Sequence, residues 1–151
     1  MKVVLQRVKQ ARVIIEEKIY QEIGLGLLAL VCIERGDDEE VLSWVAEKIA
    51  HLRIFPDEKG KFNLSIKDVG GEILLVSNFT LCGELKKGTR PSFHLAEDPM
   101  VAKEKLERLV DMLKQKNLVV KEGVFGAHME IELINDGPVT IILEKVGKKT
   151  F

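Results

Sequence analysis

The chain has 151 residues and a mass of 17.0 kDa, enough for a single domain that buries about 70% of its unfolded surface. Hydrophobic residues make up 46% and charged residues 31%, a balance that excludes a disordered chain and a membrane protein. The 23 basic and 24 acidic side chains give a net charge of -1, so any nucleic-acid partner must meet a local basic patch. With six Phe, one Tyr and one Trp, a platform that stacks many bases is also excluded.

Hydrophobic patterning predicts strands and one helix in the first half of the chain. Strands are expected at residues 3–8 and 11–15, which pair as a hairpin, and the apolar run 27–33 predicts a strand buried on both faces. A helix follows, with Asp37 as its cap and Glu40 three residues later completing a capping box. Residues 54–71 are polar and rich in glycine, which predicts a loop.

The second half is predicted to hold the second helix between strands. A strand is expected at 72–78, and after a long connection Asp98-Pro99 starts the helix. Alternation at 129–133 predicts a half-solvated strand, and a turn at 135–138 leads to the last strand at 139–144. The pattern predicts an α+β or mixed α/β domain over residues 1–146, with two main helices against a mainly antiparallel sheet, and a tail at 147–151.

Neither a metal site nor a membrane segment is expected. Cys32 and Cys82 lie in apolar, strand-like stretches and are predicted to be two buried thiols. No cysteine or histidine spacing is typical of zinc, and no stretch approaches 18 apolar residues. The sequence also begins directly on a strand pattern, so a reduced, cytoplasmic protein without cofactor is predicted.

Two polar segments stand where apolar strands begin or end. Residues 77–80, Ser-Asn-Phe-Thr, follow a very apolar strand and either face a crevice or simply form a turn. Residues 135–140, Asn-Asp-Gly-Pro-Val-Thr, suit a hairpin turn, but proline directly after glycine restricts the backbone and permits a cis bond. The common motifs of phosphate-binding loops, serine hydrolases and zinc proteases do not occur.

The two segments resemble the diagnostic motifs of the D-aminoacyl-tRNA deacylases of the widespread bacterial and eukaryotic type. Residues 77–80 match the family's S-Q-x-T motif and residues 135–140 its N-x-G-P-x-T motif, in that order. Similar stretches include MKVVLQRVKQARV, LRIFPDEKGKFNLSIKDVGGEILLVSNFTL, KKGTRPSFH and GVFGAHM, so the resemblance spans nearly the whole chain. One position departs, because Asn78 replaces the usual glutamine and shortens the amide side chain by one methylene.

The resemblance implies a barrel-like core and a homodimer that hydrolyses the ester between a D-amino acid and the 3′-terminal adenosine of tRNA. DNA and membranes are not expected partners. In the family the Gly-Pro bond is cis and reaches into the partner's pocket, so Gly137 and Pro138 are implied to stand where an L side chain would go. Selection then acts on chirality, and many D-amino acids are accepted. Glycine has no side chain to exclude, so glycine on a non-cognate tRNA is a further expected substrate.

The chemistry expected at residues 77–80 needs no protein nucleophile. An aminoacyl ester is already activated, and the backbone N–H groups of Phe79 and Thr80 are adequate donors for the developing oxyanion. The 2′-hydroxyl of the terminal ribose helps to activate water. This division of labour suits a chain without an evident catalytic triad.

Other substrate-binding residues follow from matching positions. The resemblance places Ala102, Phe125 and Met129 around the adenosine or the aminoacyl group, although Phe125 and Met129 also suit the core. Arg7 lies within an apolar strand and needs a partner, so it is expected to orient the site or the dimer interface.

The remaining candidates are polar. Asn135 and Thr140 belong to the second motif and are assigned to substrate binding. Lys86, Lys87 and Arg90 form a candidate basic patch for the tRNA backbone, and a solvated loop explains any single one of them equally well.

Two alternatives remain open at this point. One is a conventional esterase with Thr80 or Ser77 as nucleophile, which requires the fold to supply an adjacent base. The other is a non-catalytic tRNA-binding module.

Overall fold

The strand β1 (Lys2–Ile15) organises the sheet in this computed structural model, which describes residues 1–147. Along one edge β1 pairs antiparallel with β8 (Glu130–Glu144), and along the other it pairs antiparallel with β3 (Gly26–Cys32) and then β2 (Lys18–Ile23). The sheet continues through parallel pairs from β3 to β6 (Glu72–Ser77) and from β6 to β7 (Val119–Glu122). It curves until β2 approaches β7, where Lys121 Nζ donates to the Glu22 carbonyl oxygen at 2.9 Å. The predicted barrel-like core is therefore confirmed, with a larger parallel part than expected.

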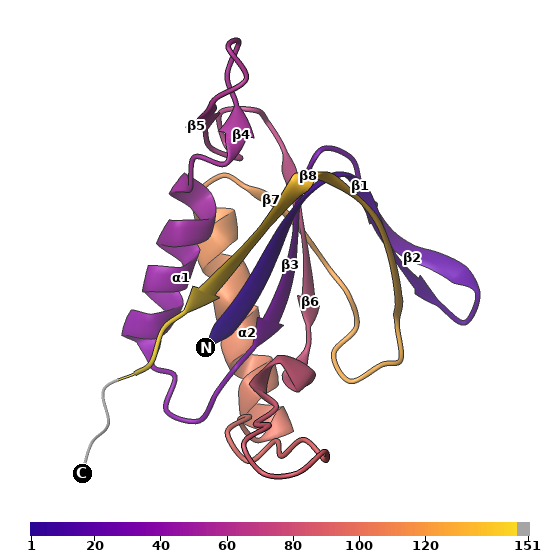
Figure 1. Cartoon of the computed structure of the whole chain (residues 1–151), viewed down its shortest axis with the longest axis vertical. Coiled ribbons are helices and arrows are strands. Elements are labelled where there is room, and N and C mark those ends of the chain that lie inside the picture. The colour runs from indigo at the N-terminus through magenta and orange to yellow at the C-terminus, as the bar shows by residue number, and fades with distance from the viewer. Residues whose placement is uncertain (148–151) are drawn as a thin grey trace.

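Two helices cover one face of this sheet, as Figure 1 shows. These are α1 (Glu39–His51) and α2 (Pro99–Gln115), which pack against each other and against the larger of two apolar clusters. The smaller cluster fills the inside of the curl, where Val8, Val13 and Val76 meet Met129 and Ile131. Two short strands, β4 (Phe55–Pro56) and β5 (Phe62–Leu64), form a hairpin, and the 3-10 turn η1 (Phe79–Cys82) follows β6. The two predicted helices and the mixed α+β class are confirmed.

Several strand boundaries differ from the sequence prediction because pairing overrides the local pattern. Residues 3–8 and 11–15 belong to one continuous strand, and its hairpin partner is the polar segment 18–23. In the same way β8 runs through the predicted turn at 135–138 as one strand with a bulge. Segments β2 and β7 are short and half polar, so their pairing with β1 and β6 decides their structure.

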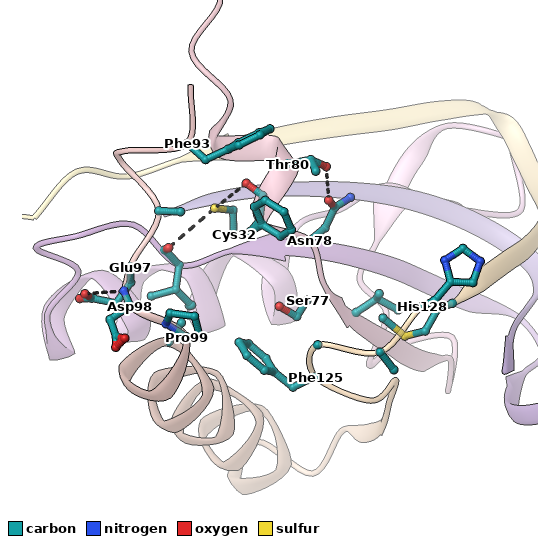
Figure 2. A pocket seen from close by; sticks show the side chains of 18 of the residues that line it. Cys32, Ser77, Asn78, Thr80, Phe93, Glu97, Asp98, Pro99, Phe125 and His128 are labelled. Atoms are coloured by element: carbon teal, nitrogen blue, oxygen red, sulfur yellow. Dashed lines mark hydrogen bonds between the residues drawn. The ribbon is translucent and has the colours of Figure 1, made fainter. Parts of the chain in front are cut away.

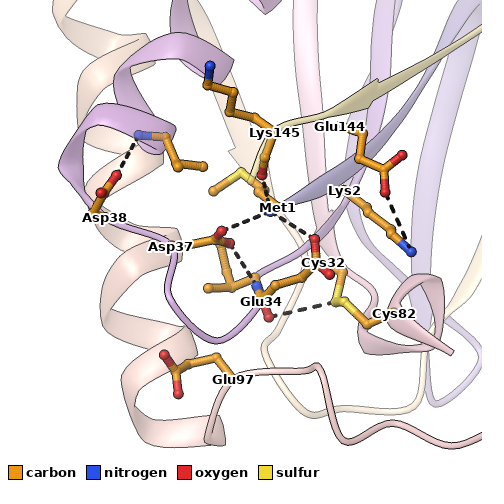
Figure 3. A network of polar contacts seen from close by, with 12 residues as sticks. Met1, Lys2, Cys32, Glu34, Asp37, Asp38, Cys82, Glu97, Glu144 and Lys145 are labelled. Atoms are coloured by element: carbon orange, nitrogen blue, oxygen red, sulfur yellow. Dashed lines mark hydrogen bonds and ion pairs between the residues drawn. A yellow bond between two sulfur atoms is a disulfide. The ribbon is translucent and has the colours of Figure 1, made fainter. Parts of the chain in front are cut away.

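Asp37 and Asp38, which precede α1, have different roles from the predicted ones (Figure 3). Asp38 is the helix cap, with its Oδ1 accepting from the N–H of Val41 at 3.0 Å. Asp37 is instead buried, and accepts from the α-amino group of Met1 at 2.8 Å and from the N–H of Glu34 at 2.7 Å. Burial raises the pKa of Asp37, although the Met1 ammonium and the Glu34 N–H act to lower it. The predicted cap at Asp37 is wrong because the first strand brings a buried cation to that carboxylate.

The two cysteines form a disulfide between Cys32 and Cys82, with Cα atoms 6.2 Å apart. The prediction that both side chains are buried is confirmed, but the prediction of free thiols is wrong. The two residues lie 50 positions apart, so local sequence gives no sign of the pairing. The bond ties the end of β3 to the end of η1.

The predicted tail at 147–151 lies outside the described residues apart from Gly147. Within residues 1–147, neither helix has the length and apolar character needed to cross a membrane.

Candidate functional site

A cavity of about 1050 Å³ opens at the carboxyl ends of β3 and β6. Figure 2 shows its walls, which come from η1, the start of α2 and the segment 125–129 that leads into β8. Residues 77–80 lie inside it, as expected for polar residues that leave the end of a buried strand. The prediction of a crevice at this motif is thus confirmed over the alternative of an isolated turn.

The backbone at residues 77–80 leaves two N–H donors open. β6 ends at Ser77, and the chain turns into η1, whose first residues have no preceding turn to accept their N–H groups. The N–H groups of Phe79 and Thr80 accordingly donate to no acceptor within residues 1–147. The N–H of Asn78, by contrast, is bound to the Val31 carbonyl oxygen at 2.8 Å. Adjacent open donors at the rim of a cavity can bind an oxyanion.

Within the described part of the chain, the hydroxyl groups of the motif have no hydrogen-bonded base. Thr80 Oγ1 donates to Asn78 Oδ1, so the shortened amide at this position is used to hold the threonine. His128 also lines the cavity, but within residues 1–147 no histidine hydrogen bonds to Ser77 or Thr80. A hydroxyl without a base is a weak nucleophile, so this geometry does not favour the conventional esterase.

Three further predicted residues come together with residues 77–80. Ala102, at the start of α2, and Phe125 and Met129, before β8, all line the same cavity. Gly123 lets this segment fold closely, because a Cβ there would lie 2.7 Å from Met129 Sδ.

Sequence reasoning missed several lining residues, including Cys32, Arg35, Phe93, Glu97 and His128. Phe93 packs edge-on against Phe79 with ring centroids 5.1 Å apart. It lies in the stretch KKGTRPSFH, which resembles the family, so that stretch could have pointed to it. Arg35 and Glu97 are in loops and carry no such signal.

Glu97 places a carboxylate that stays ionised at the cavity wall. Its Oε1 accepts from the N–H of Asp98 at 2.9 Å, and its Oε2 pairs with Lys105 Nζ at 3.0 Å. Burial acts to raise the pKa of Glu97, but these hydrogen bonds and the charges of Lys105 and Arg35 outweigh it and hold the pKa below its usual value. Among residues 1–147, no group of three or more acidic, histidine or cysteine side chains is placed to hold a metal.

The second motif lies at the other end of the sheet. Asn135 pairs with Val8, which pairs with Gly26 at the start of β3, whereas Ser77 pairs with Val31 near the end of β3. None of residues 135–140 lines the cavity. One protomer therefore does not bring its own two motifs together.

A bulge in β8 presents Gly137 and Pro138 to solvent. Residues 136–139 stand opposite a single residue of β1, Arg7, and the Gly137–Pro138 peptide bond is cis, as the resemblance implies. Asn135 braces the bulge, with its Nδ2 donating to the carbonyl oxygens of Arg7 and Val139 at 3.0 Å each.

Arg7 supports this bulge and lies away from the cavity. It is 7% exposed, and its Nε donates to the Asp136 carbonyl oxygen at 2.9 Å and its Nη1 to that of Ile54 at 2.7 Å. Thr140 is exposed and pairs with Gln6 just beyond the bulge.

The predicted basic residues lie on the connection between η1 and α2. Lys86, Lys87 and Arg90 are all exposed, and none of them lines the cavity. Lys86 pairs with Glu84 at 3.4 Å, which leaves two of the three without an ion pair among residues 1–147.

Comparison with known proteins assigns the chain to a class of hydrolases. A family model described as D-Tyr-tRNA(Tyr) deacylase matches residues 4–144. The chain is 56% identical over 144 residues to the D-aminoacyl-tRNA deacylase of Carboxydothermus hydrogenoformans, covering 95% of this chain and 99% of that protein. It is 48% identical over 151 residues to that of Thermosipho africanus, covering all of both chains. The chain belongs to the D-Tyr-tRNA(Tyr) deacylase family, and the family resemblance drawn from its motifs is confirmed.

Solved structures agree on the fold. The protein called c-Myc DNA Unwinding Element Binding Protein superposes with a TM-score of 0.91 at 40% identity, covering 96% of this chain and 99% of that one. A probable eukaryotic D-amino acid tRNA deacylase has a TM-score of 0.80 at 18% identity, covering 94% and 97%. The second likeness concerns the fold alone.

Proposed function

We propose that this chain hydrolyses the ester bond of D-aminoacyl-tRNA and releases free D-amino acid and tRNA. The observation that carries the proposal is one cavity, in a member of the deacylase family, that unites residues 77–80 with Ala102, Phe125 and Met129. Its volume of about 1050 Å³ leaves room for an aminoacyl group and the terminal adenosine. We place the activity in the cytoplasm, where aminoacyl-tRNAs are made and used.

The catalytic step is attack of water on the ester carbonyl. The negative charge that develops on the carbonyl oxygen is stabilised by the N–H groups of Phe79 and Thr80, which have no other acceptor among residues 1–147. The 2′-hydroxyl of the substrate ribose assists in activating the water. Ser77 and Thr80 do not form a covalent intermediate in this mechanism, since among residues 1–147 neither hydroxyl is hydrogen-bonded to a basic side chain.

Chiral selection is supplied by a second copy of the chain. In the proposed homodimer, Gly137 and Pro138 of one protomer enter the cavity of its partner and occupy the space that an L side chain requires. Two observations support this arrangement: the motif lies at the far end of β3 from its own cavity, and the bulge exposes both residues. Glycine presents no side chain to exclude, so glycine attached to a non-cognate tRNA is a substrate too.

The deciding experiment compares deacylation of matched D-Tyr-tRNA and L-Tyr-tRNA by the purified protein, with glycyl-tRNA as a third substrate. We expect rapid loss of D-tyrosine and glycine and little loss of L-tyrosine. Equal rates for the two tyrosyl esters would exclude chiral selection, and binding without any hydrolysis would favour a tRNA-binding module. Trapping of an acyl-enzyme would instead support the esterase with a serine or threonine nucleophile. Sedimentation at assay concentrations tests the dimer, because an active monomer contradicts the shared site.

A further inference from the structure

The cavity contains one basic side chain that neither motif includes. Among all of its lining residues Arg35 is the only lysine or arginine, and Glu97 and Asp98 are the only acids. Lys105 pairs with Glu97 at 3.0 Å and offsets that charge. Arg35 is thus the one lining group with a fixed positive charge to offer a negatively charged part of the substrate.

Arg35 is held in place on one side and open on the other. Its N–H donates to the Leu95 carbonyl oxygen at 2.9 Å, and its Nε donates to the His94 carbonyl oxygen at 3.1 Å. The two terminal Nη groups make no hydrogen bond or ion pair with any of residues 1–147, and the side chain is exposed. The Arg35 charge does act on the nearby Glu97 carboxylate and helps to lower its pKa, but Glu97 is already bound directly by Lys105. A guanidinium held through Nε presents its remaining N–H groups in a fixed plane, a geometry suited to two oxygens of a phosphate.

We propose that the Nη groups of Arg35 bind the 5′-phosphate of the terminal nucleotide while the ester on the same ribose lies beside residues 77–80. The inference rests on the proposed function and adds a phosphate subsite to it. The phosphate is the nearest negative charge to the ester in the substrate, and it is absent from free amino acid esters. Arg35 would therefore favour a nucleotide ester over other esters that fit the cavity.

A second cavity offers a different path for the nucleotide chain. It has a volume of about 400 Å³ and shares Ser77 and Phe125 with the first. Its charged lining residues are Lys103, Lys114, Lys121, Glu107 and Glu122. Lys121 is already paired with Glu72 at 3.2 Å, so the two remaining lysines face two carboxylates. This balance does not favour a phosphate, and we assign the phosphate to Arg35.

The test uses two substrates that differ by one phosphate: the 3′-D-tyrosyl ester of adenosine and that of adenosine 5′-monophosphate. We expect the wild-type protein to prefer the monophosphate by about tenfold in kcat/KM, the size of a charged hydrogen-bonded contact. Arg35→Gln should lose this preference and keep its rate on the adenosine ester. Arg35→Lys should recover part of the preference. Lys67→Gln, which removes an exposed charge on the turn before β6 and outside both cavities, serves as the matched control and should behave as wild type on both esters.

A binding readout removes any dependence on turnover of small esters. AMP and adenosine are compared as competitive inhibitors of D-Tyr-tRNA hydrolysis. We expect AMP to inhibit the wild-type protein more tightly than adenosine does, and we expect this difference to disappear in Arg35→Gln only. The phosphate assignment would be overturned if Arg35→Gln, with unchanged thermal melting, lost kcat/KM equally on both esters. It would also be overturned if Arg35→Gln kept the wild-type preference for the monophosphate ester. Loss of the preference in Lys103→Gln or Lys114→Gln instead of Arg35→Gln would move the phosphate to the second cavity. Absence of wild-type activity on D-Tyr-tRNA itself is a separate outcome, which contradicts the proposed function.

Discussion

Arg7 and Asp136 are joined across the β1–β8 bulge by a hydrogen bond of 2.9 Å from Nε to the backbone carbonyl oxygen. The other end of the guanidinium donates to the Ile54 carbonyl oxygen at 2.7 Å, and the Asp136 carboxylate lies 3.5 Å from Nε. One buried side chain thereby fixes the position of the strand segment that carries Gly137 and Pro138. An arginine at this position of an apolar strand has a structural task that indirectly serves the motif.

Replacing this arginine should weaken the fold and, with it, the proposed site shared between protomers. Arg7→Met leaves the carbonyl oxygens of Ile54 and Asp136 without their donor, and we expect the free energy of unfolding to fall by about 2–4 kcal/mol. Arg12→Met is the control, because Arg12 lies on the same strand and forms only partly exposed ion pairs of 3.5 Å, worth under about 1 kcal/mol. Urea unfolding of both variants provides the comparison, and equal losses would contradict the assignment.

Thr80→Ala should keep substantial deacylase activity, with a loss of no more than about tenfold, because alanine retains the backbone N–H that the mechanism uses. The substitution removes only the hydroxyl that binds Asn78 Oδ1. A nucleophile would lose several orders of magnitude. Single-turnover hydrolysis of D-Tyr-tRNA measures the difference, with Ser77→Ala treated in the same way. A folded Thr80→Ala protein that binds tRNA and has no activity would show that the hydroxyl, not the backbone, carries the reaction.

Reduction of the Cys32–Cys82 bond should lower stability substantially. The bond closes a loop of 50 residues, and the loss of that restraint on the unfolded chain corresponds to about 4 kcal/mol. The melting temperature, measured with and without a reductant, gives the size of this loss. The double variant Cys32→Ala/Cys82→Ala should melt at the temperature of the reduced protein, whether or not reductant is present. Thiol titration of the untreated protein that finds two free cysteines would contradict the pairing.

The ionised state of Glu97 predicts a specific acid dependence. Its folded-state pKa lies below the unfolded value of about 4.3. Its contribution to stability is thus complete above that value and is lost as the pH falls through the folded-state pKa. Stability should fall less steeply below about pH 4.3 in Glu97→Gln and in Lys105→Met than in the parent. Asp37, whose pKa burial raises, acts in the opposite direction, so each variant is compared with the parent. If stability falls with decreasing pH as steeply in both variants as in the parent, the ion pair between Glu97 and Lys105 is contradicted.

The sequence located the first motif well because its signal is local. A polar tetrapeptide after an apolar strand is visible without the fold, and the structure places Ser77 and Thr80 in the cavity. The sequence could not show that Asp38 caps the helix while Asp37 binds the α-amino group, since this depends on where Met1 lies. Arg35 was missed for a similar reason: its role depends on a contact with His94, and no motif spans that separation. Strand β2 became a strand only through its register with β1, which its own polar residues do not specify.

In the proposed dimer, each site combines the cavity of one protomer with Gly137 and Pro138 of its partner, so a damaged motif in one chain is replaced by the intact motif of the other. Ala102→Phe fills the cavity, and Gly137→Ala disrupts the bulge, because an added Cβ would lie 2.0 Å from the Val139 nitrogen. Ala102→Phe alone should be inactive, and Gly137→Ala alone should hydrolyse D-Tyr-tRNA and L-Tyr-tRNA alike. When equal amounts are unfolded and refolded together, half of the dimers are mixed, and each mixed dimer has one site built from two intact parts, so about half of the intact cavities regain selection against L-Tyr-tRNA. Two such alleles in one cell would together supply a selective enzyme, although neither encodes one alone.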